Sequence, residues 1–422
     1  MNFLYINLVY PIMYFLLGLP VNKAYKRVCE LNRLSYEGLM QHKLALLKEL
    51  YSARPLSKPL DTESQISALL QSLDIKDKSS FQKLELTEKQ TKAAFSRETA
   101  GTTGTPLKLY YTKNTIAHQL AVRRYCFSSY GVMLGEREAR FWGRREETFK
   151  SKLKEKVLNR KVFSFLGEPH YEIDSLRKFK PSYAYGYSSL ILNAAKAYDS
   201  LRIKPPKLKV IICTAETLMD FQIEFITKVF QCPVVMEYGC TEFDVIAFQC
   251  HEGEYHQVNP DLLLEESSKG CLVTDFNNTL MKMHRYRLGD DLTLSVPLCS
   301  CESHLPVITE IKGRSNKQLV KLPCGKQVHA VVFAYIAEEL NEQGYQISNF
   351  KVIQKKINSF EFFVEVSNDE RAESAPKIIV KIKELFSEKL GDDLLLNIYF
   401  KEVPLELGKK FDYFECLVPV SD

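Results

Sequence analysis

The sequence has little net charge, and it shows no internal repeat and no low-complexity linker. The lack of a repeat excludes a solenoid or a propeller and favours an ordinary globular protein. A net charge of +5 over 422 residues gives no general case for nucleic-acid binding, which usually needs a strongly basic face. With 45% hydrophobic residues, a chain of this length can bury the cores of one large domain and one smaller domain.

The cysteines do not form the even, regularly spaced set that a disulfide framework requires. There are 11 of them, an odd number, and they are unevenly scattered. This usage indicates a reducing compartment, so we expect a cytoplasmic protein.

Residues 2–19 are strongly apolar, but no lysine or arginine precedes them and no small-residue cleavage site follows, which argues against a signal peptide. Asn7 and Pro11 interrupt a run that is barely long enough to cross a bilayer. We therefore expect a buried or interfacial N-terminal helix. A transmembrane span and shallow contact with the inner leaflet of the membrane remain as alternatives.

Residues 144–161 carry eight basic and three acidic side chains, an excess equal to that of the whole chain. Such a segment is typical of a solvated helix face. The alternative is a surface for anionic lipid or for a phosphorylated glycan.

Hydrophobic periodicity predicts the order of the elements. The pattern is helical from about Val21 to Glu98. A β-branched strand at residues 207–218, a helix at 218–230 and a strand with its turn at 232–242 then give the alternation that is typical of a parallel sheet. In such sheets ligands bind beyond the carboxyl ends of the strands.

The character of the chain changes after Gly313. We expect a helix at 329–340, a hairpin of 350–356 with 360–367, a helix at 375–390 and a last strand at 394–403. The predicted fold class is α/β, with a large domain of mixed or parallel sheets and helices over residues 1–312. A small α+β domain follows over 313–422, and the large domain opens with a helical segment at about 1–95.

The stretch AGTTGTP, residues 100–106, is rich in glycine and threonine. Glycine tolerates positive φ, so the loop can turn its backbone amides inward, and the threonine hydroxyls add donors; this arrangement suits phosphate. The loop is not a P-loop, because the G-x-x-x-x-G-K-[ST] spacing is absent.

Four further motifs follow this loop in order: EYGCTE at 237–242, RYRLGDD at 285–291, IKGRSNK at 311–317 and PLELGKK at 404–410. With KPSYAYGYSSLI and ICTAETL between them, this set resembles the adenylate-forming (AMP-forming) ligases. The resemblance is to the branch of phenylacetate-coenzyme A ligases and the CapK-type proteins of capsule and exopolysaccharide clusters. It runs from about Phe95 to the C-terminus and implies a large ATP- and acid-binding domain with a small mobile domain.

The resemblance also implies a role for each matching residue, and each role suits the chemistry of the side chain. Thr99, Gly101, Thr102, Thr103 and Gly104 match the loop that grips the β- and γ-phosphates of ATP. Tyr238 and Gly239 match the adenine segment, and Thr241 and Glu242 match the pair that meets the α-phosphate and Mg²⁺. Asp290 matches the ribose-binding carboxylate, Arg314 a second ribose or phosphate contact, and Lys409 the catalytic lysine of the small domain.

Three departures separate this sequence from the family pattern. Thr105 stands where many members have lysine, and Asn316 stands where the family usually has a hinge aspartate. The last motif is followed by FDYFE instead of a basic tail. Because of these departures, a catalytically weakened or scaffold-like relative remains an alternative.

The candidate residues for the pocket wall flank two predicted strand ends. Tyr185, Gly186 and Tyr187 precede a helix and are candidates for binding the acid, while Ala215 and Glu216 end a strand and are candidates on the cofactor side. Tyrosines accept an aromatic acid or a sugar by stacking, and the sequence does not choose between them.

Cys250, His256, Cys299 and Cys301 supply three thiolates and an imidazole. This set satisfies a closed tetrahedral structural zinc site. His251 is a rival ligand and His304 a weaker one.

The sequence thus predicts an AMP-forming ligase with ATP, Mg²⁺ and structural Zn²⁺. It would activate a carboxylic acid and pass the acyl group to an amine or to a thiol such as coenzyme A, in capsule or exopolysaccharide biosynthesis. A coenzyme A ligase of small-molecule metabolism and a non-catalytic nucleotide-binding relative remain as alternatives. No nucleic acid is expected as a partner, and peripheral contact with the inner membrane or a lipid-linked glycan stays open.

Overall fold

The computed structural model describes residues 2–419 except for short gaps, which are 51–61, 83–86, 88–94, 100–105, 143–147, 166–168, 269, 297–298, 302, 313–318, 367–370 and 404–410. Two compact units divide the chain. The first unit comprises Met1–Glu138, Leu153–Arg160 and Val235–Lys312, and the second comprises Ala139–Lys152, Lys161–Val234 and Gly313–Asp422. One boundary therefore falls directly before Gly313.

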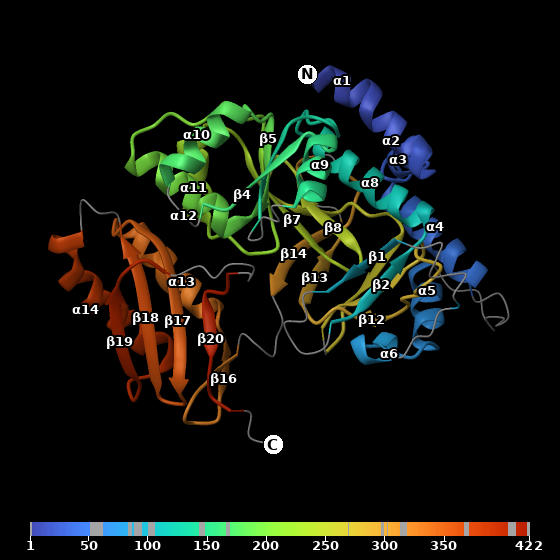
Figure 1. The fold of residues 1–422 in the computed structure, drawn as a ribbon. Helices are drawn as coiled ribbons and strands as arrows, with labels where there is room; N and C mark the ends of the chain where they lie inside the picture. The colour runs from blue at the N-terminus through green and yellow to red at the C-terminus, as the bar shows by residue number, and fades with distance from the viewer. Residues whose placement is uncertain are drawn as a thin grey trace. The chain divides into compact units, whose positions relative to one another are not determined.

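The first unit begins with helices (Figure 1). Residues 2–17 form one apolar helical stretch made of α1, the π-helical turn η1 and α2, and Gly18 ends it in the left-handed conformation with φ 65°. Their bounds and those of the next helices are α1 Asn2–Leu4, η1 Tyr5–Val9, α2 Tyr10–Leu17, α3 Val21–Leu31, α4 Tyr36–Leu50, α5 Thr62–Gln71 and α6 Lys78–Gln82.

Among the described residues, no single helix has both the length and the apolar character needed to cross a membrane. Asn2–Leu17 and Val21–Leu31 meet that criterion only as a pair, and the pair is bent by 101°.

The helical pattern predicted from Val21 to Glu98 is wrong at its end. Phe95–Glu98 forms β1, which pairs antiparallel with β2, Lys108–Tyr111. The physical reason is that pairing with β2 stabilises β1. Leu109 and Tyr111 of β2 are completely buried, whereas the four residues of β1 are too few to show a strand pattern by themselves.

The sheets of the first unit pack around helix α8, Lys113–Ser128, whose N-terminus is capped by the Thr112 hydroxyl accepting from the Thr115 amide at 3.0 Å. Helix α3 packs against α8. One run of antiparallel strands has the order β13 Asp291–Ser295, β14 Val307–Lys312, β9 Tyr255–Gln257, β8 Asp244–Gln249 and β7 Val234–Cys240. A second sheet has the order β10 Leu262–Glu265, β11 Leu272–Asp275 and β12 Tyr286–Arg287.

The second unit contains a run of strands in the order β6, β5, β3 and β4, of which β5 and β6 are parallel. Helices alternate with these strands, as the sequence predicts for residues 207–230 (Figure 1). The bounds are β3 Glu138–Phe141, α9 Phe149–Val157, β4 Arg160–Phe163, α10 Pro169–Phe179, β5 Tyr183–Tyr187, α11 Ser188–Ser200, β6 Ile211–Thr214 and α12 Asp220–Phe230. The unit boundary divides α9, whose residues from Leu153 onward belong to the first unit. The mixed α/β fold class is confirmed.

The last part of the second unit is a four-stranded sheet in the order β19, β18, β17, β20, against which α13 and α14 pack. The predicted helices, the hairpin and the strand within 394–403 are present, the last of these as β19, but β19 is not the final strand, because β20 follows it and pairs parallel with β17. A core of phenylalanines, including Phe333 and Phe360, holds this sheet to its helices. The bounds are β15 Leu319–Lys321, β16 Gln327–His329, α13 Val331–Glu342, β17 Ile347–Lys356, β18 Ser359–Val366, α14 Arg371–Leu390, β19 Leu395–Phe400 and β20 Phe414–Cys416.

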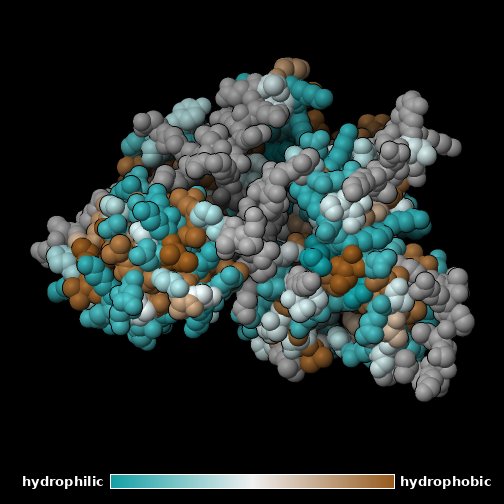
Figure 2. Space-filling view, turned by 90° about the horizontal axis from the view of Figure 1, so that it is seen from below, coloured by the Kyte–Doolittle hydropathy of each residue, from teal (hydrophilic) through white to brown (hydrophobic). Residues whose placement is uncertain are grey.

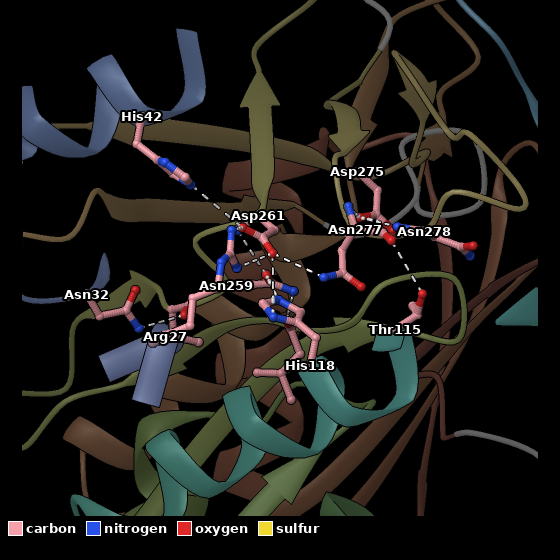
Figure 3. Close-up of polar contacts among 12 residues, drawn as sticks. Arg27, Asn32, His42, Thr115, His118, Asn259, Asp261, Asp275, Asn277 and Asn278 are labelled. Carbon is pink, nitrogen blue, oxygen red and sulfur yellow. Dashed lines mark hydrogen bonds and ion pairs between the residues drawn. The ribbon is translucent and has the colours of Figure 1, made fainter. Parts of the chain in front are cut away.

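A buried polar network centred on Asp261 joins the helices of the first unit to its sheets (Figure 3). Arg27 of α3 donates from Nη1 and Nη2 to the two carboxylate oxygens at 2.7 and 2.8 Å. His118 of α8 lies 3.5 Å from the same carboxylate and bonds Asn259 at 2.9 Å. Burial alone would raise the pKa of Asp261, but the neighbouring His42, His118 and Arg27 outweigh it and hold that pKa well below its usual range.

Lys43 of α4 is a completely buried lysine next to this network, and its Nζ lies 3.4 Å from Oε1 of Gln257. Burial lowers the pKa of Lys43 to about 7, although the charge of Asp261 opposes the shift. The folded protein therefore binds the Lys43 proton more weakly than the unfolded chain does.

This difference predicts a pH dependence of stability. Above about pH 7 the unfolded chain keeps the Lys43 proton while the folded protein loses it, so rising pH stabilises the fold by up to about 1.4 kcal/mol per pH unit. From pH 7 to pH 9 we expect the free energy of unfolding of the wild type to rise relative to that of Lys43→Met, measured by urea titration. Lys48→Met, which changes an exposed lysine of the same helix, is the control. A difference in the free energy of unfolding between the wild type and Lys43→Met that does not change with pH would contradict the prediction.

Candidate active site and metal centre

The turn after β7 carries Thr241 and Glu242, and its backbone leaves no room for a side chain at Gly239. A Cβ at that position would lie 2.1 Å from the backbone oxygen of Asp244. Asp244 itself has φ 58°, in the left-handed region that non-glycine residues rarely adopt. The chain therefore doubles back at once into β8, and this tight return fixes where Thr241 and Glu242 lie.

Two buried tyrosines from other strands hold this turn. The Tyr111 hydroxyl, at the end of β2, donates to the backbone oxygen of Thr241 at 2.6 Å. The Tyr286 hydroxyl, in β12, donates to Oε1 of Glu242 at 3.2 Å. Sequence analysis did not single out either tyrosine, because each lies far along the chain from its partner and only the folded sheet brings them together.

Asp290 is bound to Tyr238, another of the predicted site residues. The Tyr238 hydroxyl donates to Oδ2 of Asp290 at 2.8 Å. Burial raises the pKa of Tyr238, and the charge and hydrogen bond of Asp290 raise it further, so the hydroxyl keeps its proton and can donate it. The structure thus joins the EYGCTE and RYRLGDD motifs in the first unit by two tyrosine–carboxylate hydrogen bonds, Tyr238 to Asp290 and Tyr286 to Glu242.

Thr99 and Leu107, which flank the predicted phosphate loop, are hydrogen-bonded to each other. The Thr99 amide donates to the Leu107 oxygen at 3.0 Å, and the Thr99 hydroxyl accepts from the Leu107 amide at 2.9 Å. The loop residues themselves lie outside the described residues, as do two other predicted site residues. These are Gly101, Thr102, Thr103, Gly104, Arg314 and Lys409.

In the second unit, Tyr185 and Tyr187 share one face of β5, as the two-residue period of a strand requires. The Arg140 guanidinium lies 4.8 Å from the ring centre of Tyr185, and Trp142 stacks on Tyr187 with ring centres 4.1 Å apart. Arg140 and Trp142 are two residues apart on the same chain segment, so they match the spacing of the tyrosines. Sequence analysis missed this pair, although Trp142 is the one tryptophan of the chain.

Gly186 lies between the two tyrosines, on the opposite face of β5. A Cβ there would lie 2.0 Å from the backbone oxygen of Phe141, and φ at Gly186 is 153°. Only glycine lets β5 and the Phe141 backbone approach this closely.

Ala215 and Glu216 follow β6, as predicted. Ala215 has φ 72°, a left-handed conformation that costs an alanine about 1 kcal/mol or more. The buried Glu216 carboxylate accepts from the Ser189 amide in the first turn of α11 at 2.8 Å and from the Phe411 amide. Glu216 therefore ties the start of α11 to the chain directly after residues 404–410.

The four predicted metal ligands come together in the first unit. Their ligand atoms all lie within 4.8 Å of one another, so the group could hold a metal ion. Sγ of Cys250 is 3.6 Å from Sγ of Cys299, and Sγ of Cys301 is 3.2 Å from Nε2 of His256. Nδ1 of His256 lies 3.2 Å from the Leu305 oxygen, which directs Nε2 to the thiols.

The spacing suits a tetrahedral site, because sulfurs about 2.3 Å from a central zinc ion lie about 3.8 Å from one another. The rival ligands do not join the group. Nε2 of His251 lies 3.1 Å from the Ser129 oxygen, and its ring packs against Tyr130 with ring centres 4.4 Å apart. His304 is exposed and is not one of the four clustered residues.

Comparison with known proteins adds to this geometry. No family model matches the chain. The CapK protein of Staphylococcus aureus is 26% identical over 337 residues, which are 74% of this chain and 72% of CapK.

Solved structures with a similar fold cover most of the chain. A 2-hydroxyisobutyryl-CoA ligase in the postadenylation state, in complex with R3-HIB-AMP, has a TM-score of 0.65 at 12% identity, covering 93% of this chain and 88% of that one. The anthranilate CoA ligase AuaEII in complex with anthranoyl-AMP has a TM-score of 0.52 at 14% identity, covering 78% and 67%. The amide bond synthetase McbA from Marinactinospora thermotolerans has a TM-score of 0.50 at 12% identity, covering 84% and 76%.

The fold is that of the adenylate-forming ligases. Together with the ordered motifs and the similarity to CapK, this fold confirms the predicted resemblance to the adenylate-forming ligases. Within that superfamily, the sequence is similar to CapK.

The ligand cluster predicts metal binding. We expect protein purified without chelator to contain about one zinc ion per chain, and Cys299→Ser to contain much less, as measured by plasma emission spectrometry. Cys324→Ser, which changes an exposed cysteine outside the cluster, should keep its zinc. If wild-type protein contained no transition metal, the prediction of a metal centre would be wrong.

Proposed function

We propose that this protein is an AMP-forming ligase of capsule or exopolysaccharide biosynthesis. It activates a carboxylate with ATP to an acyl-adenylate and transfers the acyl group to an amine or a thiol. The observation that carries the proposal is a set of two hydrogen bonds, from Tyr238 to Asp290 and from Tyr286 to Glu242, each of which joins the EYGCTE motif to the RYRLGDD motif in a chain with the adenylate-forming fold.

Each part of the nucleotide has a proposed partner in the first unit. The Asp290 carboxylate accepts from the ribose hydroxyls, while Tyr238 and Gly239 lie against adenine. Thr241 and Glu242 face the α-phosphate, where Glu242 would hold Mg²⁺. Thr99 and the glycine loop that follows it bind the β- and γ-phosphates, and Arg314 adds a second contact to ribose or phosphate. The hydrogen bond from Tyr238 supports this assignment, because it orients a carboxylate that must accept from a diol.

The reaction has two steps. An oxygen of the substrate carboxylate forms a bond to the α-phosphorus of ATP, and the bond from that phosphorus to the pyrophosphate oxygen breaks. The amine or thiol then bonds to the activated carbonyl carbon, loses its proton, and AMP leaves. Glu242 would hold Mg²⁺, which would supply positive charge to the phosphate oxygens, and Lys409 would stabilise the charge that builds at the α-phosphorus. Closure of the small domain, residues 313–422, excludes water from the adenylate.

The acid would lie against the aromatic face of β5. Tyr185, Gly186 and Tyr187 form its wall, with Trp142 beside Tyr187. Flat aromatic surfaces accept an aromatic acid or the face of a sugar ring by stacking. Ala215 and Glu216 belong to the same proposal as positioning residues, because the Glu216 carboxylate is already bound to two backbone amides.

The similarity to CapK supports a role in capsule or exopolysaccharide biosynthesis, and the cysteine usage supports a cytoplasmic location. The solved relatives include coenzyme A ligases as well as an amide bond synthetase, which supports both kinds of acceptor. The cysteine and histidine cluster would hold a structural zinc, since four protein ligands leave no open position for a substrate.

Two observations favour alternative functions. The fold shared with coenzyme A ligases supports a soluble aryl- or acyl-coenzyme A ligase of small-molecule metabolism. Thr105 and Asn316 depart from the family pattern, which supports a non-catalytic nucleotide-binding relative. Exchange of labelled pyrophosphate into ATP over a panel of aryl, fatty, amino and uronic acids tests the proposal. Exchange with none of them would reject the ligase.

The ribose assignment predicts a binding defect. Asp290→Ala removes the acceptor of two charged hydrogen bonds, so we expect ATP affinity to fall by about 10- to 100-fold in isothermal titration. Asp291→Ala changes the neighbouring carboxylate and should bind ATP as the wild type does. Equal losses in both variants would show that the effect is not specific to the ribose contact.

The lysine assignment predicts a defect in the chemical step. Lys409→Ala should lower the rate of pyrophosphate exchange by about 100-fold or more while ATP affinity stays nearly unchanged. Lys410→Ala is the matched control and should keep most of the rate. If Lys410→Ala were the inactive variant, the motif would be shifted by one residue; if both exchanged normally, the assignment would fail.

A further inference from the structure

In the N-terminal helical stretch, residues 2–17, the side of the helix that faces solvent is apolar. Its exposed positions follow a helical period, and their side chains are almost all apolar. Phe3 is 79% exposed, Phe15 85% and Leu16 76%. The other apolar members of this outer face are Leu4, Leu8, Ile12 and Leu17.

The inner face carries the tyrosines, and they bind the body of the first unit. The Tyr5 hydroxyl donates to the backbone oxygen of Lys156 at 2.9 Å, and the Tyr10 hydroxyl donates to that of Leu158 at 3.1 Å. Gly135 lets the stretch approach closely, since a Cβ there would lie 3.2 Å from the Ile6 amide and from the Tyr10 ring. These contacts fix the rotation of the helix, so the apolar face is held outward.

The outer face is also uncharged. Asn7 is its one amide side chain, and that amide donates to the Phe3 backbone oxygen of the preceding turn at 2.9 Å. The first charged residue of the chain is Lys23. Leaving this apolar surface in water is unfavourable in free energy, because burial of each exposed leucine or phenylalanine side chain would be stabilising.

Basic side chains of the same unit border the stretch. Lys154 and Lys156 are exposed on the last turn of α9, whose Lys156 oxygen accepts the Tyr5 hydrogen bond, and Leu153 and Val157 are exposed beside them. At the other end, the side chain of Lys113 reaches Gly18, where its Nζ would lie 2.9 Å from a Cβ. Lys23 and Lys26 are exposed on the helix that follows.

We propose that residues 2–17 lie in the plane of an anionic lipid bilayer, with Phe3, Phe15 and Leu16 among the acyl chains and the lysines at the headgroups. A helix of this length is about 24 Å long, shorter than the roughly 30 Å hydrocarbon layer. Gly18 ends it, and the chain then bends by 101° into a charged helix. An apolar face bordered by lysines is the pattern of an interfacial helix.

This surface differs from the exposed apolar residues elsewhere. Figure 2 shows a different face of the protein, where hydrophobic residues are interspersed with hydrophilic ones. Scattered residues of that kind are normal on a protein surface and need no partner. The proposal makes no use of nucleotide or acid, so it can hold or fail independently of the proposed function.

The test is flotation of the full-length protein with vesicles of phosphatidylcholine alone and of phosphatidylcholine with phosphatidylglycerol. We expect the wild type to float with the anionic vesicles, and Phe15→Ser/Leu16→Ser to partition at least about tenfold less. Lys154→Glu/Lys156→Glu should weaken partitioning about fivefold or more, on the anionic vesicles alone. Leu395→Ser, at a residue 63% exposed on β19, is the control and should float as the wild type does.

Thermal melts confirm that each variant is folded, and Phe3→Ser/Leu4→Ser repeats the test at the other end of the helix should the first pair unfold. Wild-type protein that stays with neither kind of vesicle overturns the proposal, as does undiminished flotation of a folded serine variant. If the wild type is a dimer that the serine variants dissociate, with no flotation, the face is a protein interface and the proposal is wrong.

Discussion

The buried carboxylate of Asp261 is the constraint on which the first unit depends. It accepts two hydrogen bonds from Arg27 of α3, lies beside His118 of α8, and accepts from Asn277 at 3.2 Å (Figure 3). A carboxylate in this position would be costly without those partners, and the partners would be costly without the carboxylate. Helices distant along the chain are thereby required to meet at one point. Asp261 directly precedes β10, and the sheet of β10 also contains β12, whose Tyr286 binds Glu242.

The two groups of candidate residues are positioned by different means. In the first unit, tyrosine hydroxyls hold the candidate carboxylates, so the positions of Glu242 and Asp290 depend on side chains from other strands. In the second unit, close backbone approach and ring stacking set the aromatic face of β5. Hydrogen bonds to carboxylates fix direction as well as distance, which is what the proposed nucleotide contacts would require. Stacking fixes only a plane, which tolerates a change of acid.

Much of the fold was predictable because its signals are local. The strand, helix and strand around residues 207–242 show their periods within a dozen residues each, and the cluster around Cys250 rests on thiol and imidazole chemistry that spacing reveals. β1 escaped prediction because four residues are too few to show a period of two. The hydrogen bonds of Tyr111 and Tyr286 escaped it because they join residues 130 and 44 positions apart, which no local pattern records. The stacking of Trp142 on Tyr187 could not be predicted, because it depends on β3 and β5 being neighbours in the sheet.

Gly186 limits which amino-acid substitutions β5 can accept during evolution. The backbone oxygen of Phe141 occupies the space of any side chain at position 186, so every substitution there forces β3 and β5 apart. Tyr185 and Tyr187 lie on the other face of β5, where they contact the Arg140 and Trp142 side chains. Substitution of either tyrosine therefore alters contacts between side chains, whereas substitution of Gly186 alters the pairing of β3 with β5 itself.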